Sequence, residues 1–593
     1  MNRHLIAAGL AVLAASAFGA SDGVVHADVV IYGSSPAAIS AAVQAKRMGA
    51  SAVVVSPETR IGGLTTGGLG QTDIGNKAAF GGIALEFYKA VGKYYGEQTD
   101  KWRFEPSAAL SILEGWEKRD ALDIRRGEWL DRVDGVEKKD GRIVSMKTLS
   151  GNIYRGKVFV DATYEGDLMA AAGVKYHVGR ESNSVYGETL NGNQPDMAVH
   201  HQLSPGVDPY VVPGDPKSGL LTGVEPYDPN LKPGDGDARV QAYCFRLCLT
   251  DKPENRIPFA KPEGYDERDY ELMFRHYEAV PPGKAKKLAP PWINSRMPNR
   301  KTDTNNKRGF SMDYIGQSWR WAEATYQERA KILAAHLKYQ KGLMWTLANH
   351  PRVPESIRNE VSRWGTCKDE FPDGFGDGWQ KQLYVREARR MIGEYVMTEH
   401  NCRGKAVAPH PVAMGAYAMD SHHVRRYVGA DGFVHNEGDV EVGKDENGKR
   451  YPPYSIDYGA IVPKRGECAN LLVPICLSAS HIAFGSIRME PVFFALGQAA
   501  GTAAALAAAG GSPVQDVPYA ALRKRLVADG QVIELAPPVL AAEEKKAGWT
   551  DVCDTPYWET IDAVREMGGR MYQIRAGVNS GVEEEKGAEY RDI

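Results

Sequence analysis

Four residues in the second half of the chain are the candidates for catalysis: His481, Arg488, Arg386 and His422. An imidazole titrates near working pH, so either histidine can take or return a proton during a reaction. A guanidinium group can anchor an anion through parallel hydrogen bonds. His481 ranks first as the proton-handling group, because it stands between a predicted buried strand and a predicted buried helix. The alternative for each histidine is a packed ring bonded to a backbone carbonyl.

The first element that can position such chemistry is a βαβ unit near the N-terminus. Residues 29–32 form a short apolar run rich in β-branched side chains, which predicts a buried strand. Pro36 suits the first position of a helix, and Gly49 after two basic residues marks the helix end. Residues 52–55 are the second predicted strand. The turn between strand and helix is of the type that binds dinucleotide pyrophosphates, through free N–H groups and the helix dipole.

This turn departs from the usual dinucleotide fingerprint in two places. Gly33 fills the first position of G-x-G-x-x-G and Ala38 is an accepted third, but Ser35 replaces the middle glycine. Ser56 stands at the end of the second strand, where an acidic residue usually binds the ribose hydroxyls. An ordinary βαβ unit without a nucleotide stays open as the alternative. The candidate phosphate-binding residues of the turn are Gly33, Ser34, Ser35, Pro36, Ala37 and Ala38.

A second glycine-rich segment, R-I-G-G-L-T-T-G-G at residues 60–68, resembles the FAD-dependent oxidoreductases related to the fumarate-reductase and glutathione-reductase-like flavoproteins. The longer run at 62–76 is similar to a narrower family of exported bacterial FAD-dependent oxidoreductases. The resemblance covers about residues 27–510 and implies non-covalently bound FAD. It implies that this segment closes over the FAD pyrophosphate and that residues 158–163 return the chain to the nucleotide-binding sheet. The cofactor-binding residues implied there are Ser56, Arg60, Gly62, Gly63, Leu64, Thr65, Ala162 and Thr163.

The closing motif of the resemblance lies at residues 470–509. An apolar run at 470–474 predicts a buried strand, and a loop of small residues leads from it to His481. The helix predicted at 491–509 is apolar on all sides, which is typical of a helix inside a protein. In the resembled flavoproteins the matching helix points its positive end at the pyrimidine edge of the flavin, where negative charge builds up when flavin accepts hydride. This adds Glu490, Pro491 and Val492 to the implied cofactor-binding residues.

The predicted fold class is α/β. A Rossmann-like FAD-binding domain with a β-meander is interrupted by a mixed, largely helical cap that binds the substrate. Helices are predicted in the cap at 319–349, 355–364 and 380–397, and Arg386 falls on one face of the last. The predicted divisions are a signal peptide at 1–20, FAD-binding segments at 27–175 and 441–515, the cap at 176–440 and a peripheral segment at 516–593.

Charge and the N-terminal pattern limit the partners and the location. A net charge of -3 over 593 residues gives no electrostatic footprint for nucleic acid. A charged start followed by a short apolar segment is typical of a signal peptide, so we expect cleavage between residues 18 and 21. The mature enzyme is then periplasmic or secreted and has no stable membrane insertion. An uncleaved membrane anchor is the alternative.

The cysteines and histidines do not indicate a metal site. The seven cysteines are scattered and include no C-x-x-C pair. Buried thiols are expected, with one or two bridges, and Cys244 and Cys248 are close enough in sequence to form one. The adjacent His422 and His423 point in different directions on a helix or a strand, which argues against a shared metal.

The function that follows from the resemblance is transfer of hydride between a small organic substrate and flavin N5. A sugar or polyol-like alcohol is favoured, because residues 292–326 are rich in Tyr, Trp, Asn and Asp, as carbohydrate sites often are. Oxidation of an alcohol needs a base for the hydroxyl proton, and His481 is assigned that role. Three alternatives remain: a reductase of an unsaturated carboxylate with Arg386, Arg390 and Arg488 as the anion site, a non-redox flavoprotein isomerase, and an exported carbohydrate-binding protein with a vestigial nucleotide fold.

Overall fold

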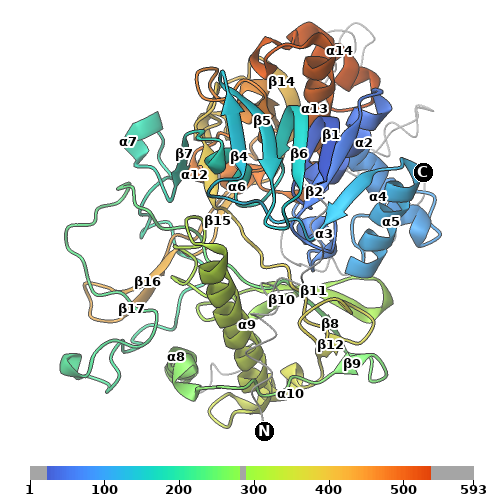
Figure 1. The fold of residues 1–593 in the computed structure, drawn as a ribbon. Helices are drawn as coiled ribbons and strands as arrows, with labels where there is room; N and C mark the ends of the chain where they lie inside the picture. The colour runs from blue at the N-terminus through green and yellow to red at the C-terminus, as the bar shows by residue number, and fades with distance from the viewer. Residues whose placement is uncertain (1–22, 281–288, 536–593) are drawn as a thin grey trace, which may run out of the picture.

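The computed structural model describes residues 23–280 and 289–535. The predicted signal peptide, its cleavage point and most of the predicted peripheral segment lie outside this part of the chain. Figure 1 shows a sheet flanked by helices in the upper half, and a region of strands, long loops and one long helix in the lower half. The predicted α/β fold class is confirmed by the parallel pairing in the upper sheet.

A seven-stranded sheet forms the upper half. Its order is β3-β2-β1-β6-β5-β4, with β20 paired to β6. Strands β1, β2, β3, β6 and β20 run parallel, whereas β4, β5 and β6 form an antiparallel meander, as predicted. The strands are β1 (Val24–Tyr32), β2 (Ala52–Ser56), β3 (Asp123–Arg126), β4 (Val136–Lys139), β5 (Arg142–Lys147), β6 (Ile153–Asp161) and β20 (Leu471–Leu472). The sheet is therefore completed by a strand that follows the whole cap in sequence.

Two helices made of small residues pack on each other beside this sheet, α2 (Pro36–Arg47) and α13 (Glu490–Gly510). The prediction that α13 is buried on all sides is confirmed, since every residue from 490 to 505 is buried. Among the described helices, α13 is the one whose length and composition would suit a membrane span, but 89% of that window is buried inside the protein. A Cβ on Gly497 or Gly501 would lie 2.4 or 2.5 Å from a carbonyl oxygen of α2, so the two backbones are in direct contact.

Gly501→Val is therefore expected to lower the free energy of unfolding by about 1–3 kcal/mol or more, because the added side chain forces the two helices apart. Urea unfolding of the purified protein measures the change. Gly510→Ala in the same helix is the control, since its Cβ would meet only Ser512 Oγ at 3.6 Å. Equal stability of the two variants would show that α2 and α13 do not pack this closely.

The remaining helices around the upper sheet are short. They are α3 (Gly63–Thr66), α4 (Gly82–Tyr94), α5 (Pro106–Arg119), α6 (Asp167–Ala171), α12 (His481–Ile487) and α14 (Tyr519–Ala528). Helix α12 begins at His481, at the end of the segment predicted to be a loop. The Ser480 hydroxyl caps it by accepting from the backbone N–H of Ala483.

The lower half contains more strand than the sequence predicts. An antiparallel sheet has the order β10-β11-β8-β12-β9, and four two-stranded pairs accompany it. The strands of the sheet are β8 (Leu247–Thr250), β9 (Arg256–Ile257), β10 (Trp292–Arg296), β11 (Lys301–Asn306) and β12 (Gly365–Cys367). The paired strands are β7 (Tyr176–Val178) with β13 (Arg389–Met391), β14 (Pro411–Gly415) with β19 (Tyr454–Asp457), β15 (Met419–Ser421) with β18 (Val440–Val442), and β16 (Arg425–Val428) with β17 (Val434–Glu437). The helices are α7 (Asn183–Tyr186), α8 (Glu271–Glu278), α9 (Tyr326–Asn349), α10 (Glu355–Val361) and α11 (Glu399–Cys402).

The helix predicted at 380–397 is wrong. This segment is extended, because the backbone N–H of Tyr384 bonds to the carbonyl of Cys244 at 2.8 Å and β13 pairs with β7. Its side chains from 383 to 391 are buried, so their helical spacing does not mark one buried face. The helix predicted at 319–349 begins later, at Tyr326, where Thr325 and Glu328 form a capping box.

The described cysteines are all free and buried. The suggested Cys244–Cys248 bridge is wrong. The Sγ atom of Cys244 lies 3.5 Å from Arg386, whereas the Sγ of Cys248 lies 3.9 Å from that of Cys367 on the neighbouring strand β12. Cys553 lies outside the described residues.

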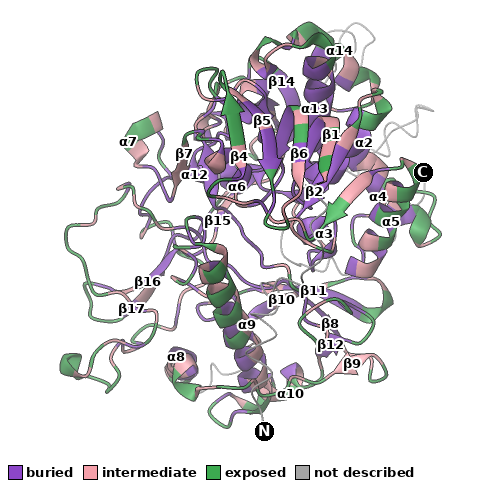
Figure 2. Ribbon diagram, viewed as in Figure 1, coloured by how far each residue is buried: buried purple, intermediate pink, exposed green. Residues whose placement is uncertain are grey.

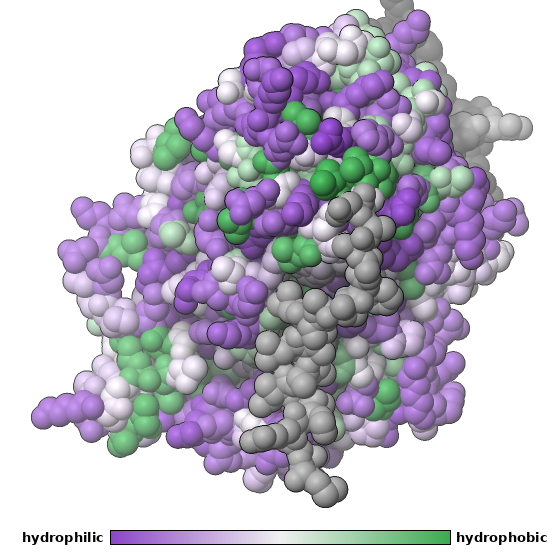
Figure 3. Space-filling model, in the orientation of Figure 1, coloured by the Kyte–Doolittle hydropathy of each residue, from purple (hydrophilic) through white to green (hydrophobic). Residues whose placement is uncertain are grey.

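Burial is greatest in the parallel sheet and the helices that cover it, as the purple ribbon in Figure 2 shows. On the face drawn in Figure 3, hydrophilic side chains predominate and apolar ones occur in scattered patches. Scattered apolar residues are normal on a protein surface. The largest core of the molecule therefore lies where the sheet, α2 and α13 meet.

Candidate active site

The three segments predicted to hold the cofactor phosphates lie against one another. Gly33 has φ +130°, and a Cβ there would lie 2.5 Å from the carbonyl oxygen of Ala162 at the end of β6. The hydroxyl of Ser35, which caps α2, donates to the same oxygen at 2.7 Å. The second glycine-rich segment joins this turn through the N–H of Gly62, which donates to the carbonyl of Ser34 at 2.6 Å. Because only glycine tolerates this approach at position 33, the turn, R-I-G-G and β6 meet at one place.

The end of β2 carries an acidic residue that the sequence analysis missed. The hydroxyl of Ser56 donates to the backbone carbonyl of Glu58 at 2.7 Å, so it is already used within the turn. The carboxyl group of Glu58 has no hydrogen-bond partner in the described part of the chain. Burial, with the charge of nearby Glu165, raises the pKa of Glu58 to about 7. An acid two residues beyond the usual position therefore stands where nucleotide-binding folds hold the ribose hydroxyls.

Glu490, at the first position of α13, links that helix to the second glycine-rich segment. Its carboxyl group accepts from the N–H of Thr65 at 3.0 Å and from the Thr65 hydroxyl at 2.5 Å. The hydroxyl of Tyr164 donates to the other oxygen of Glu490 at 3.0 Å and accepts from the N–H of Leu64. Burial raises the pKa of Glu490 to about 7. The N-termini of α3 and α13 are thus held together around one buried carboxyl group.

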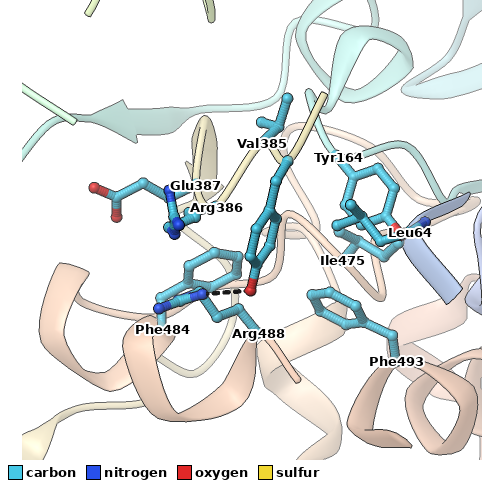
Figure 4. Close-up of a pocket in the computed structure, with 10 residues that line it drawn as sticks. Leu64, Tyr164, Val385, Arg386, Glu387, Ile475, Phe484, Arg488 and Phe493 are labelled. Atoms are coloured by element: carbon cyan, nitrogen blue, oxygen red, sulfur yellow. Dashed lines mark hydrogen bonds between the residues drawn. The ribbon is translucent and has the colours of Figure 1, made fainter. Parts of the chain in front are cut away.

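A cavity with about 240 Å³ of atom-free space lies beside this cluster. Figure 4 shows Leu64 and Tyr164 on one side of it, Arg386 and Glu387 on the other, and Phe493 of α13 below. The other lining residues are Tyr384, Val385, Ile475, Phe484 and Arg488. The cavity therefore lies between the nucleotide-binding part and the extended segment at 384–387. We call it the flavin-side cavity.

Three arginines surround the ring of Tyr384 in the flavin-side cavity. Their guanidinium carbons lie 4.6 to 5.9 Å from the ring centroid. Each is paired with an aspartate: Arg246 with Asp303 at 2.8 Å, Arg386 with Asp313 at 2.8 Å, and Arg488 with Asp420 at 3.3 Å. Burial raises the pKa of Asp420 to about 7, so near neutral pH its proton is shared with solvent. The group of arginines therefore carries at most one unbalanced positive charge.

His422 forms a histidine–aspartate pair with Asp313 next to the flavin-side cavity. Its Nδ1 lies 2.8 Å from Asp313 Oδ2, and the same aspartate binds Arg386 of the cavity lining. The Nε2 atom has no hydrogen-bond partner in the described part of the chain, and the side chain is 12% exposed. Burial and the charge of Arg386 lower the pKa of His422 to about 3, so the ring is neutral at working pH. With Nδ1–H donating to Asp313, the lone pair of Nε2 is available to accept a proton.

His481 is buried behind this pair, and both of its ring nitrogens are occupied. Nδ1 lies 2.9 Å from the carboxylate of Glu387, and Nε2 lies 3.1 Å from the Ser421 hydroxyl. Glu387 also accepts from the N–H of Gln241, whose side-chain oxygen accepts from the N–H of His422. His481 therefore supports the backbone that carries His422. The ranking that placed His481 first is revised in favour of His422.

The comparisons with known proteins follow from the whole chain. A sequence model of the FAD dependent oxidoreductase family matches residues 28–526. The chain belongs to this family. No curated protein matches it.

Solved structures that resemble parts of the oxidoreductase include flavoenzymes of several kinds. A flavin-containing monooxygenase from Stenotrophomonas maltophilia is 17% identical over 29% of this chain and 45% of its own, with a TM-score of 0.18. Thioredoxin reductase from T. acidophilum is 21% identical over 27% and 40%, with a TM-score of 0.16. Bacillithiol disulfide reductase from Staphylococcus aureus is 15% identical over 31% and 49%, with a TM-score of 0.17. The oxidoreductase spans less than half of the length of each of these three structures.

FAD is the cofactor of the family, and the residues of this oxidoreductase fit it. The glycine turn, the R-I-G-G segment and the helix N-terminus of α2 together form a site for the pyrophosphate. Two buried donors that face the flavin-side cavity, Nε of Arg386 and Nε of Arg488, have no hydrogen-bond partner among the described residues. Oxygen and nitrogen acceptors at the edge of a flavin ring are the kind of group that satisfies such donors. Pro491 and Val492 place the positive end of α13 at the same side.

Two residues of the predicted site have local roles that the sequence did not show. Arg60 does not lie on the glycine turn: its Nε donates to the carbonyl of Thr66 at 2.9 Å, and its Nη1 pairs with Asp373 at 3.0 Å. The hydroxyl of Thr163 donates to the buried carboxylate of Asp161 at 2.6 Å. Arg60 therefore fastens the second glycine-rich segment from outside, and Thr163 fixes the end of β6.

Glu490 predicts how the stability of the apoprotein depends on pH. Its native pKa of about 7 lies above the ordinary value of 4.5, so the native state binds this proton more tightly than the unfolded chain does. The apoprotein should then lose up to about 3 kcal/mol of this contribution as pH rises from below 4.5 through 7. Urea unfolding at pH 5 and pH 8 should show a smaller loss for Glu490→Gln than for the parent. The exposed residue Glu263, changed to Gln, is the control that should leave the loss unchanged.

Proposed function

We propose that the oxidoreductase oxidises a hydroxyl group of a sugar or polyol-like compound. FAD, when bound, accepts the hydride from the substrate carbon. The observation that carries the proposal is the His422–Asp313 pair, with a free Nε2 beside a cavity lined by Arg386 and Arg488. Oxidation of an alcohol releases the hydroxyl proton as hydride leaves, and a neutral imidazole in this position is a base for that proton.

Asp313 makes this base effective. By accepting from Nδ1 it fixes the tautomer in which Nε2 carries the lone pair, and it stabilises the imidazolium that forms. Arg386 holds Asp313 from the other side at 2.8 Å, and both residues are buried. The pair therefore keeps its orientation when a substrate enters.

The charge balance of the flavin-side cavity supports a neutral substrate. An unsaturated carboxylate would need unpaired arginines with bidentate reach, as its recognition depends on charge-assisted hydrogen bonds. Here Arg246, Arg386 and Arg488 are each matched by an aspartate. The unbonded Nε groups of Arg386 and Arg488 are the feature that keeps the carboxylate reductase as the second candidate. The non-redox isomerase and the vestigial binding protein are set aside by membership in an oxidoreductase family.

The location and partners of the oxidoreductase are proposed from the sequence alone. The charged and apolar start of the chain supports export, followed by life in the periplasm or outside the cell. A small molecule, without nucleic acid or a membrane, is the partner we propose.

Anaerobic stopped-flow absorbance tests the substrate class. The flavin of the holoenzyme should bleach on mixing with neutral sugars or polyols, because these donate hydride. Chemically reduced enzyme should not be reoxidised by fumarate or other unsaturated carboxylates. Reoxidation by carboxylates, with no bleaching by any neutral alcohol of the panel, would establish the reductase instead.

A further inference from the structure

A second cavity lies in the cap, and nothing in the proposed redox reaction uses it. It has about 300 Å³ of atom-free space, part of it open to solvent, which is the lower end of the range for small-molecule sites. Its floor is Arg426 of β16, and Tyr339 of α9 forms part of its wall. Figure 1 places β16 and α9 in the lower half of the molecule, apart from the parallel sheet.

Arg426 is a buried cation with no carboxylate partner among the described residues. It is 6% exposed, its Nε donates to Asn436 Oδ1 at 2.8 Å, and its Nη2 donates to the carbonyl of Gly309 at 3.1 Å. Its Nη1 has no hydrogen-bond partner there. The adjacent Arg425, by contrast, pairs with Glu437 at 3.1 Å. A buried charge that meets only neutral partners costs stability, so an anion that completes the site would be strongly favoured.

The walls and the mouth of this cavity indicate what kind of anion fits. Phe310 lies against the guanidinium of Arg426 at 5.1 Å, and Tyr314 and Tyr339 stack on each other at 4.0 Å, so the walls are aromatic. A small inorganic anion would lose its hydration against such walls without gaining contacts. At the mouth are the exposed Thr222 and the partly exposed Asp269, which can bond to hydroxyl groups.

We propose that this cavity is a second binding site, for a small carboxylate that carries a hydroxylated ring. The carboxylate pairs with Arg426, the ring lies along the aromatic wall, and the hydroxyl groups reach Thr222 and Asp269. The site is distinct from the flavin-side cavity but shares a segment with it: Asp313 pairs with Arg386 there, while the next residue, Tyr314, lines this one. A ligand here would therefore contact the segment that holds the catalytic pair.

Calorimetric titration of the holoenzyme tests the proposal with two matched pairs of probes. D-Glucuronate and 4-hydroxybenzoate are the carboxylates, and D-glucose and 4-hydroxybenzamide are their neutral counterparts. At least one carboxylate should bind more tightly than its counterpart. Arg426→Gln should weaken that binding about 10- to 100-fold, since a charge-assisted hydrogen bond is lost. Arg426→Lys should retain part of the affinity because the charge remains.

Two further variants separate this site from the alternatives. Thr222→Trp blocks the mouth from an exposed position that tolerates substitution, so it should abolish binding even if Arg426→Gln fails to fold. His422→Ala should leave carboxylate binding unchanged. The proposal is overturned if neither carboxylate binds at millimolar concentration, or if binding survives in Thr222→Trp. It is also overturned if His422→Ala removes the binding, because the ligand then occupies the flavin-side cavity.

Discussion

His422→Ala is expected to lower the rate of flavin reduction by substrate by about 10²- to 10⁴-fold while the protein keeps its FAD. The substitution removes the base that takes the hydroxyl proton, but His422 touches none of the residues of the glycine turn. Stopped-flow bleaching measures the rate, and the flavin absorbance of the purified variant measures FAD content. Because the pKa of His422 lies at about 3, the parent should show no loss of activity from protonation of this group between pH 5 and 8.

His435→Ala is the matched control, because it removes another histidine–aspartate pair. His435 Nε2 lies 3.0 Å from Asp431, and the side chain is 42% exposed in the β16–β17 hairpin. Flavin reduction should be unchanged in this variant. Asp313→Asn should lie between the two, since the base remains but its tautomer is no longer fixed. Parent-like bleaching in His422→Ala would show that the histidine is structural and that the alcohol-oxidation proposal lacks its base.

Gly62→Val is expected to weaken FAD binding by roughly 100-fold or more, against about fivefold for Ser56→Ala. Gly62 has φ +91°, and a Cβ there would lie 2.5 Å from side-chain atoms of Leu113 and Thr66. The valine therefore displaces the segment whose N–H bonds to Ser34 in the phosphate turn. Ser56→Ala removes one hydrogen bond within its own turn. Fluorescence titration of apoprotein with FAD measures both affinities.

Gly432→Val controls for backbone strain alone. Gly432 has φ +82° in the β16–β17 hairpin, and no atom lies within 4 Å of its Cβ position. The variant should lose stability but keep the FAD affinity of the parent. Equal affinities for Gly62→Val and Ser56→Ala would mean that R-I-G-G does not form part of the cofactor site.

The nucleotide-binding unit and α13 could be predicted because their signals are local. An apolar run followed by a glycine turn and a proline specifies β1 and α2 within about twenty residues, and α13 is apolar on every side. Periodicity failed at 380–397 for a physical reason. A segment buried on all sides has no amphipathic face, and its pairing partners, β7 and Cys244, are far away in the sequence.

The candidate base could be named from the sequence but not ranked. His422 and His481 look alike as letters, and the difference between them lies in contacts with distant residues. Asp313, which orients His422, is 109 positions away, and Glu387, which occupies His481, is 94 positions away. Glu58 was missed for a simpler reason: the acid lies two residues beyond the position that the fingerprint prescribes.

The pairing of β20 with β6 and the packing of α13 on α2 also set the order of events in folding. The apolar face of α2 stays uncovered until residues 490–510 have been synthesised, and the contacts that close the core join the two ends of the described chain. Such long loops slow folding and leave unfolded or half-folded chains open to aggregation. The phosphate turn comes from the first part of the chain and the flavin-side cavity is closed by the last. Tight capture of FAD therefore reports the final step of folding, and flavin fluorescence can time it.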